Sequence, residues 1–189
     1  MAKTYGTVTT FTAGSVLTAA QLNVASTAVN NLVVPPMAQI ALTASTAVTT
    51  ASHTAFSGFT NSNASATYDT DAMTSLSATP SAITVQTAGV YQVSATATWA
   101  ANATGIRYAR IVRSRGGTLV AYAVASVTNI GAVFEQQISL SGLIDCQAND
   151  LIRLMVYQDS GGNLNLLSGA PTNDFGGTRL SAVWIGRTS

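Results

Sequence analysis

The sequence predicts an all-β protein, a sandwich of about eight to ten antiparallel strands preceded by one short amphipathic helix. Three observations support this prediction. Small and β-branched residues dominate a chain of 189 residues in which only 8% are charged. Residues 90–99 alternate between apolar and polar side chains, which is the period of a half-buried strand. Clusters of Gly, Asn, Asp and Ser then recur toward the C-terminus and indicate turns between strands.

The one helical pattern lies in residues 1–36. Thr18 is a good N-cap, and Gln21 completes a capping box. Pro35-Pro36 ends the pattern, because the residue before a proline disfavours helix. So short a helix is unstable alone in water, so it docks either onto its own domain or, as an anchor or three-helix collar, onto a larger structure. Its apolar positions recur at spacings of three and four: Leu22, Ala25, Val29 and Leu32.

We expect residues 1–36 to attach the protein to a partner and residues 37–189 to form the folded domain. Within the latter, residues 39–43 are predicted to form a short strand, and residues 46–52 are compatible with another. We interpret the remainder up to residue 80 as edge strands and surface loops rather than a linker, because its larger side chains need burial: Phe56, Phe59, Tyr68 and Met73.

From residue 83 onward, predicted strands follow one another. Residues 90–99 place their odd-numbered, apolar side chains on the buried face. Further strands are predicted over residues 106–112, 118–127, 132–140, 151–157 and 180–185. In residues 132–140, Phe134, Ile138 and Leu140 fall on one side. Short strands separated by turns in this way predict a sandwich.

Charge and composition exclude several classes of function. Eight Lys and Arg against seven Asp and Glu leave a net charge of +1, which does not fit a protein that mainly binds nucleic acid. The single cysteine, Cys146, and the single histidine, His53, exclude a disulfide framework and a Cys- or His-rich metal centre. No apolar signal core follows Met1 and no run is long enough to cross a bilayer, so we expect neither secretion nor membrane insertion. No cofactor is predicted.

An ordered set of short motifs carries a resemblance to a known family. The motifs are Tyr68-Asp69-Thr70, Ile83-Thr84-Val85, Ala88-Gly89-Val90-Tyr91-Gln92-Val93 leading to Trp99, Ala148-Asn149-Asp150 before residues 151–158, Ser160-Gly161, and Phe175 followed by Trp184-Ile185-Gly186. Residues 40–186 thereby resemble the complement-component/tumour-necrosis-factor-like jelly roll, and most closely its versions in bacteriophage virion proteins of the minor tail, fibre or capsid-fibre type. Asn149 stands where the family usually has glycine, but asparagine also tolerates a left-handed turn. The leading segment, residues 10–36, is similar to the start of many small actinobacteriophage structural proteins.

The resemblance implies a homotrimer in which each subunit lays one sheet edge against a three-fold axis. The composition independently favours association, because few charges keep copies of the chain apart. Small residues at 120–125 would let neighbours approach closely. We expect Tyr122, Tyr157 and Trp184 to anchor the interface, since Tyr and Trp are favoured in buried interface cores. The alternative is that they only fill the core of the sandwich.

Few residues have the potential for chemistry. His53 has no carboxylate nearby in sequence and no Gly-x-Ser-x-Gly motif occurs, so no catalytic histidine is predicted. Cys146 is expected to be a passive buried thiol. Asp69 and Asp71 form an Asp-x-Asp pair that could supply two oxygens to a cation or cleave a glycan, but we favour a role in holding a turn.

Half of the basic residues lie within nine positions: Arg107, Arg110, Arg113 and Arg115. On a strand, Arg107, Arg113 and Arg115 share one face and Arg110 points the other way. With Tyr108 as the one aromatic among them, a nucleic-acid surface is not predicted. We expect ion pairs between subunits, to Asp residues or Glu135, or stacking near the trimer axis, which makes Arg110 a candidate interface residue. Contact with a glycan or an anionic envelope is the alternative.

The sequence therefore predicts a structural component of a phage virion and no enzyme. It would form a homotrimeric jelly-roll knob on the tail or fibre apparatus, bound to other virion proteins and contributing to adhesion, with host surface glycan as a candidate ligand. One alternative is a capsid fibre or decoration protein on the head. Another is a virion enzyme that cleaves envelope glycan. A secreted host ligand-binding module is disfavoured because no signal peptide is visible.

Overall fold

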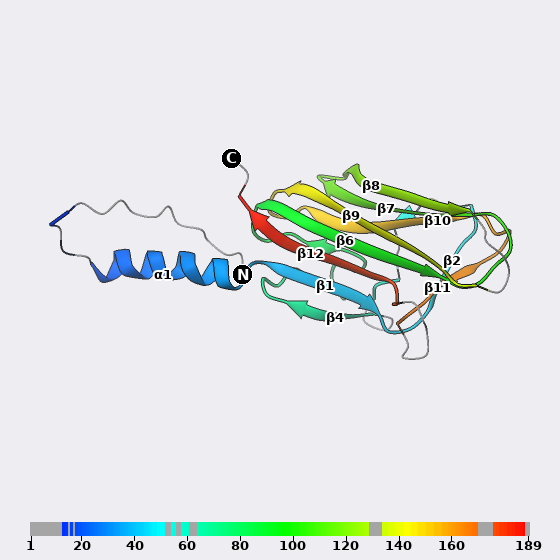
Figure 1. Ribbon diagram of the computed structural model, residues 1–189, viewed down its shortest axis with the longest axis horizontal. Coiled ribbons are helices and arrows are strands. Elements are labelled where there is room, and N and C mark those ends of the chain that lie inside the picture. Colours follow the sequence, from blue (N-terminus) through cyan, green and yellow to red (C-terminus); the bar gives the residue numbers. More distant parts are fainter. Residues whose placement is uncertain are drawn as a thin grey trace.

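The predicted strands fold into two antiparallel sheets that face each other, and a helix projects from one end (Figure 1). This computed structural model describes residues 13–14, 16, 18–51, 54–55, 58–60, 64–128, 134–169 and 176–187. Within them, one sheet has seven strands and the other has five. The hydrophobic core lies between the sheets, which is the arrangement of a sandwich.

The seven-stranded sheet has five strands side by side and two short strands next to the far end of β6: β4 (Ala64–Asp69), β1 (Met37–Leu42), β12 (Arg179–Gly186), β6 (Gly89–Trp99) and β9 (Gln136–Cys146), then β11 (Leu164–Leu166) and β2 (Thr46–Val48). The five-stranded sheet has four strands in order and one short strand on the end of β10: β3 (Thr54–Ala55), β10 (Leu151–Gln158), β7 (Ile106–Arg115) and β8 (Thr118–Thr128), then β5 (Ile83–Thr84). Strands β9 and β8 are thus edge strands, one in each sheet.

The all-β prediction is confirmed, with more strands than the eight to ten expected, since the described residues form twelve. The difference comes from β2, β3, β5 and β11, which have only two or three residues each. A strand of that length contains too few residues to show a period of two, so the sequence gives no signal for it. The predicted strand at residues 46–52 accordingly ends at Val48.

Strand β6 confirms the alternation predicted for residues 90–99. Its odd-numbered side chains are buried and face the other sheet, and Gln92 and Ser94 are exposed. Thr96 and Thr98, however, are buried although they point outward. The segment that leads into β12 covers this part of the sheet, because the hydroxyl of Thr98 donates to the carbonyl of Gly176 at 2.6 Å.

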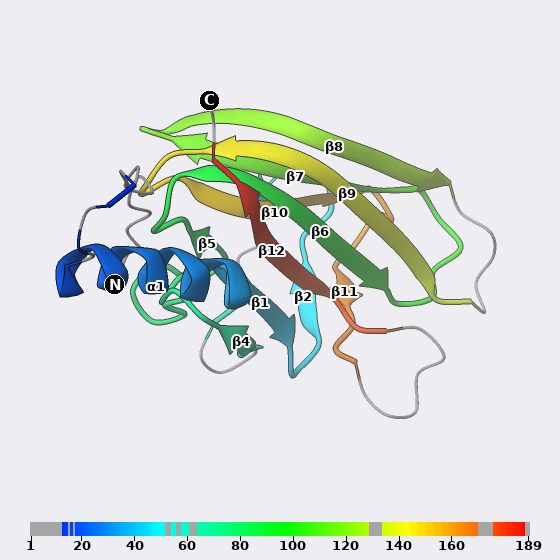
Figure 2. The same ribbon diagram turned by 60° about the vertical axis from the view of Figure 1, so that its left-hand side comes forward.

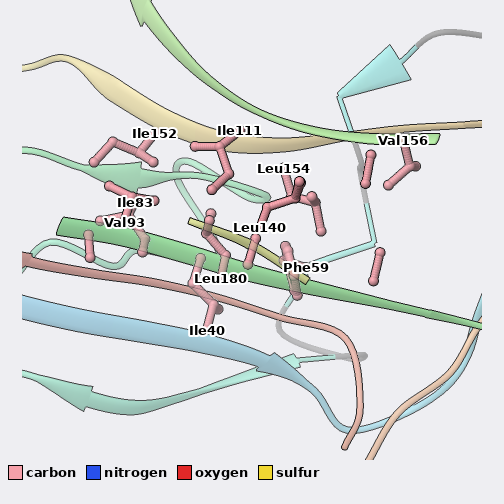
Figure 3. Close-up of a cluster of buried hydrophobic side chains, with 14 of the residues drawn as sticks. Ile40, Phe59, Ile83, Val93, Ile111, Leu140, Ile152, Leu154, Val156 and Leu180 are labelled. Atoms are coloured by element: carbon pink, nitrogen blue, oxygen red, sulfur yellow. The ribbon is translucent and has the colours of Figure 1, made fainter. Parts of the chain in front are cut away.

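Large apolar side chains from both sheets meet in the core (Figure 3). The labelled members are Ile40, Val93, Leu140 and Leu180 from the seven-stranded sheet, Ile83, Ile111, Ile152, Leu154 and Val156 from the five-stranded sheet, and Phe59 from a connecting segment. Phe59 and Met73, predicted to need burial, are both 0% exposed, and Tyr68 is half-buried. Phe56 lies outside the described residues.

Helix α1 (Ala19–Val33) begins and ends as predicted. The backbone N–H of Thr18 donates to Gln21 Oε1 at 3.0 Å, and the Gln21 N–H donates to the Thr18 hydroxyl oxygen at 3.3 Å, which confirms the capping box. The sandwich does not cover the apolar stripe, because Leu22 is 60% exposed and Val29 57%. Ala25 is half-buried, and the side chain of Leu32 lies outside the described part of the chain.

The strand predicted over residues 132–140 is shifted along the chain. β9 runs from Gln136 to Cys146, so the alternation that buries Ile138 and Leu140 continues beyond Gly142 to Ile144 and Cys146. Phe134 precedes the strand and is 61% exposed, contrary to its predicted place on the apolar side.

Candidate interaction surfaces

Strand β8 forms one edge of the five-stranded sheet, and within the described residues it pairs with β7 alone. Its sequence, TLVAYAVASVT, contains no charged residue. Apolar side chains along it remain in solvent, since Leu119 is 51% exposed, Val120 38% and Val124 55%. Proteins usually protect so long an edge with charges, proline or a covering element. β8 therefore has the properties of an interface strand.

Strand β9 lies beside β8 at this side of the sandwich (Figure 2). The two strands pack directly against each other at Gly142, where a Cβ would lie 3.7 Å from the carbonyl oxygen of Tyr122, an ordinary contact distance. On the outer face of β9, Leu143 is 58% exposed. The exposed apolar residues of the two strands are named here the β8–β9 edge: Leu119, Val120, Val124 and Leu143.

Tyr122 and Trp184, two predicted interface anchors, both contribute to the core of the single chain. Tyr122 is half-buried against the core, and the Arg113 guanidinium carbon lies 5.4 Å from its ring centroid. Trp184 is 7% exposed, and its Nε1 donates to the carbonyl of Ala88 at 3.2 Å. Trp184 therefore leaves little surface for a neighbouring subunit, whereas part of Tyr122 stays accessible beside the β8–β9 edge.

The other two predicted anchors, Tyr157 and Arg110, lie on the outer face of the five-stranded sheet. Three cross-strand pairs of β7 and β10 stand in a row there: Tyr108–Tyr157, Arg110–Met155 and Val112–Arg153. Along each strand, these residues alternate with buried residues that face the core, so all six side chains share the outer face. We name the four polar members the Tyr–Arg face: Tyr108, Arg110, Arg153 and Tyr157.

Arg110 and Arg153 have no acidic partner among the described residues, where the ion pairs involve other arginines. Both side chains are half-buried, and the Nε of each is buried without a hydrogen-bond partner. Arg153 was not among the predicted site residues, because it lies on another strand, far along the chain from the arginine group. The available signal was the alternation of residues 151–157, which puts Arg153 and Tyr157 on the same face.

Arg107 faces inward, on the opposite side of β7 from Arg110, and serves the fold. It is fully buried at one end of the sandwich, where its Nη1 donates to the carbonyl of Thr104 at 2.7 Å and its Nη2 to Oδ1 of Asn102 at 3.1 Å. Burial lowers the pKa of the Arg107 guanidinium, and the nearby Asp159 carboxylate offsets part of that effect. Arg107 is therefore a structural residue that holds the turn leading into β7.

Arg113 and Arg115 also share the inner face, at the other end of β7, and their partners belong to the same chain. Arg113 donates to the carbonyl of Asp145 at 2.6 Å. Arg115 Nη2 lies 2.7 Å from a carboxylate oxygen of Asp150, which is 2% exposed. The predicted pairing between subunits is thus unnecessary for these two arginines.

Asp69 holds a turn, the role favoured from the sequence. Its Oδ1 accepts the backbone N–H of Met73 at 2.8 Å, and its Oδ2 accepts the Thr74 hydroxyl at 2.7 Å. Asp71 is 2% exposed, and its Oδ2 accepts the Thr87 hydroxyl at 2.7 Å. The two carboxylates therefore do not form an exposed acid–base pair. In the described part of the chain, no group of three or more His, Cys, Asp or Glu side chains is placed to hold a metal ion.

Cys146 is a buried thiol at the end of β9. Burial raises the pKa of the Cys146 thiol to about 12, and the negative charge of Asp150 adds to the effect. So high a pKa fits the passive role predicted from the sequence. His53 lies outside the described residues. No helix in the described ranges has the length and apolar character needed to span a membrane.

Comparison with known proteins identifies the fold. No family model and no curated protein matches the sequence. Among solved structures, Eiger TNF from S. frugiperda superposes with a TM-score of 0.56 at 9% identity, covering 82% of this chain and 96% of that one. The fold is a TNF-like jelly roll. Murine APRIL gives a TM-score of 0.54 at 12% identity, covering 79% of this chain and 98% of its own. The globular domain of zebrafish complement 1qA protein gives 0.48 at 12% identity, covering 77% and 99%.

The TNF-like jelly roll accounts for the topology described above. It confirms the fold that the motifs of residues 40–186 implied. The identities are so low that the likeness concerns the backbone arrangement alone. The surfaces that serve this chain must therefore be inferred from its own side chains, chiefly the β8–β9 edge, the helix stripe and the Tyr–Arg face.

Proposed function

We propose that this protein is a structural and adhesive component of a bacteriophage virion, a homotrimeric knob of the tail or fibre apparatus. The observation that carries the oligomeric part is the β8–β9 edge, where an uncharged edge strand of eleven residues exposes apolar side chains on both of its faces. Such an edge promotes uncontrolled pairing unless something covers it. A second copy of the chain is the occupant we infer. The motifs of residues 10–36 and of the jelly roll support the virion part.

A closed ring of three copies requires the β8–β9 edge of one subunit to pack onto a different surface of the next. The outer face of the seven-stranded sheet has suitable side chains, because Ala41, Ser94 and Ser181 are small. Its polar groups also bind one another, since Gln39 Nε2 donates to the Ser181 hydroxyl oxygen at 2.9 Å. Small side chains at these positions permit the close approach that an apolar edge needs.

The helix supports the same assembly. Leu22 and Val29 occupy one position of a heptad pattern, and Ala25 and Leu32 the other. Leu22 and Val29 are exposed in the single chain, and an isolated helix of this length is marginal in water. Three helices packed around one axis would bury the stripe and form the collar that attaches the knob. Three jelly rolls held together would then make weak single contacts with a host surface effective through multivalency.

Light scattering on the purified full chain tests the oligomeric part. We expect the mass of a trimer, and Leu143→Glu should shift the protein toward the monomer, because it places a charge in the apolar interface. Asn163→Glu is the matched control, since it adds the same charge at an exposed turn and should leave a trimer. A monomeric wild-type chain at micromolar concentration, with an intact fold, would contradict the trimer.

A truncated chain tests attachment. The deletion should remove residues 1–33 and keep Pro35 and Pro36. The carbonyl of Pro35 accepts the Thr70 hydroxyl at 2.7 Å, and that of Pro36 accepts the Trp184 N–H at 2.8 Å. We expect a folded trimer that no longer enters particles. Immunogold labelling of purified wild-type particles gives the position on the virion. Absence of the chain from particles would contradict the virion role, and a label on the head would contradict the tail position.

A further inference from the structure

The Tyr–Arg face carries an inference about the ligand, and it rests on the adhesive function proposed above. We propose that this face binds an acidic polysaccharide of the uronic-acid type, in which each sugar ring bears its own carboxylate. The partner is defined by chemistry alone: a chain of rings that can lie against tyrosines while its carboxylates reach arginines.

The spacing of the four residues favours an elongated ligand. Tyr108 and Tyr157 are directly opposite each other, and Arg110 and Arg153 follow along the same face. Successive pairs on one face are about 7 Å apart along the strands. Arg110 and Arg153 are diagonal neighbours, about 7–8 Å apart at the backbone. The face thus presents an aromatic pair followed by two cationic groups in a line.

The charge of the face has no counterpart in the described chain. Arg113 and Arg115 have acidic partners, but no carboxylate among the described residues pairs with Arg110 or Arg153. Two neighbouring guanidinium groups without a counter-ion repel each other, and a bound anion removes that repulsion. A guanidinium also presents a fork of N–H donors that matches a carboxylate in a bidentate geometry. Charge complementarity therefore selects an anionic occupant.

The two arginines are held in place rather than free. Val112 and Met155 point outward on the same face, yet they are only 1% and 6% exposed. Their directly opposite neighbours on this face are Arg153 and Arg110, whose long apolar stems are the adjacent side chains available to cover them. A cation whose stem is already packed loses little freedom when it binds, which favours affinity.

The tyrosines distinguish a sugar from other polyanions. A tyrosine combines an apolar ring with a polar hydroxyl, which suits the mixed surface of a sugar ring. A polyuronate satisfies tyrosines and arginines within the same repeating unit, whereas a glycerol-phosphate chain has no ring for the tyrosines. Nucleic acid requires more phosphate contacts than two arginines provide, and the chain's net charge is only +1.

The proposed trimer leaves most of this face accessible. The β8–β9 edge is at the side of the sandwich, and the receiving surface belongs to the seven-stranded sheet. Val124 of the edge lies directly opposite Arg110 on the outer face of the five-stranded sheet, so the interface borders the Tyr–Arg face at β7. Arg153 and Tyr157 are one strand farther away, on β10, and stay clear of it. This assigns Arg110 and Tyr157 to ligand contact instead of the subunit interface expected from the sequence.

Isothermal titration of the full chain with an oligogalacturonate tests the proposal. The comparison ligands are a neutral maltooligosaccharide, an oligo(glycerol phosphate) and a single-stranded oligonucleotide of similar length. We expect oligogalacturonate to bind best, with an affinity that falls as salt rises. Arg110→Gln with Arg153→Gln should weaken binding about tenfold or more, because two charge-assisted contacts are lost. The control is Arg187→Gln, an exposed arginine outside both proposed surfaces, which should bind within about twofold of the wild type.

Each result decides the proposal. The proposal is overturned if the wild type does not bind oligogalacturonate, or if it binds the glycerol-phosphate chain or the oligonucleotide equally well. It is also overturned if Arg110→Gln with Arg153→Gln binds oligogalacturonate with the affinity of the wild type. Light scattering on every variant separates the two hypotheses. A monomer that binds the ligand contradicts the trimer alone, and a trimer that does not bind contradicts the ligand alone. A trimer that dissociates on Arg110→Gln with Arg153→Gln makes these residues interface contacts, which contradicts the ligand proposal. If that variant does not fold, Arg110→Lys with Arg153→Lys keeps charge and stem, and should still lose several-fold in affinity because the fork is gone.

Discussion

Arg115, at the end of β7, forms a bidentate ion pair with Asp150, in the turn that leads from β9 into β10. Arg115 Nε donates to Oδ1 at 2.9 Å and Nη2 to Oδ2 at 2.7 Å. Oδ2 also accepts the backbone N–H of Gln147 at 2.8 Å, so the carboxylate closes the turn in which Asn149 adopts a φ of 72°. Because β7 and β9 belong to different sheets, the pair ties the two layers together at this end.

This ion pair predicts a loss of stability in acid. Burial by itself would raise the pKa of Asp150, but the hydrogen bonds from Arg115 and Gln147, with the charges of Arg115 and Arg113, lower it below the usual value. A lowered folded pKa means that the stabilisation is complete above about pH 4 and is lost as pH falls through the folded value. Thermal unfolding between pH 7 and pH 2 should show this decline.

Substitution isolates the contribution of Asp150. Asp150→Asn should cost about 2 kcal/mol at pH 7, since charge-assisted hydrogen bonds of a buried group are lost, and should flatten the acid limb of the stability curve. Asp145→Asn is the control, because its exposed carboxylate lies 4.0 Å from Arg115 and such pairs contribute less than about 1 kcal/mol. An acid limb unchanged in Asp150→Asn would show that another group governs it.

Gly89 is predicted to tolerate no side chain. Its φ is +152°, and a Cβ would lie 2.1 Å from Trp184 Nε1 and 2.4 Å from the carbonyl oxygen of Gly186. Gly89→Ala must therefore displace Trp184 or the neighbouring backbone, and we expect a loss of about 3 kcal/mol or more in urea unfolding. Gly116→Ala serves as the comparison, because its φ is +54° with nothing within 4 Å, so only about 1–2 kcal/mol of backbone strain is expected. Equal losses would show that the clash at Gly89 is relieved.

Local patterns in the sequence predict much of this fold. The capping box of Thr18 and the alternation of residues 90–99 depend on neighbours a few positions away, and both are present in the structure. Short strands such as β11 were missed because they form only when longer strands provide partners. Phe134 was placed wrongly since the start of a strand depends on its tertiary partner, here β6.

The candidate surfaces were less predictable than the fold. The division of the arginines of β7 between two faces follows from the strand period, and the register confirms it. The meeting of Tyr108 with Tyr157, and of Arg110 with Arg153, depends on the register between β7 and β10, which no local pattern contains. Likewise, only the sheet order makes β8 an edge strand and turns its apolar residues into an exposed surface.

A buried polar chain around Asp71 predicts sensitivity at Thr87. The Thr87 hydroxyl donates to Asp71 Oδ2 at 2.7 Å, while Asp71 Oδ1 is buried without a partner. Thr87→Val keeps the shape but removes the donor, so we expect a loss of about 2 kcal/mol in urea unfolding. Thr87→Ser retains the hydroxyl and should lose less than half as much. The bond from the Tyr91 hydroxyl to the Thr87 carbonyl, at 2.6 Å, survives in both variants. Equal losses would attribute the effect to packing of the methyl group.

Cys146 predicts how the protein responds to alkali. Its folded pKa of about 12 lies above the ordinary value of about 8.5 expected in the unfolded chain. The unfolded thiol therefore ionises first as pH rises, and folding stability should fall from about pH 8.5 upward and continue to fall toward the folded value. Cys146→Ala removes the ionisable group and should flatten this alkaline limb. Its free energy of unfolding at pH 7 will be lower than that of the wild type, because a buried side chain becomes smaller.

A thiol-reactive dye at pH 8 gives an independent measurement, since the folded protein should react roughly a thousandfold more slowly than the urea-unfolded chain. Rapid labelling of the folded protein would mean that this end of β9 opens readily, and the ion pair of Arg115 with Asp150 beside it would then be weaker than its geometry indicates.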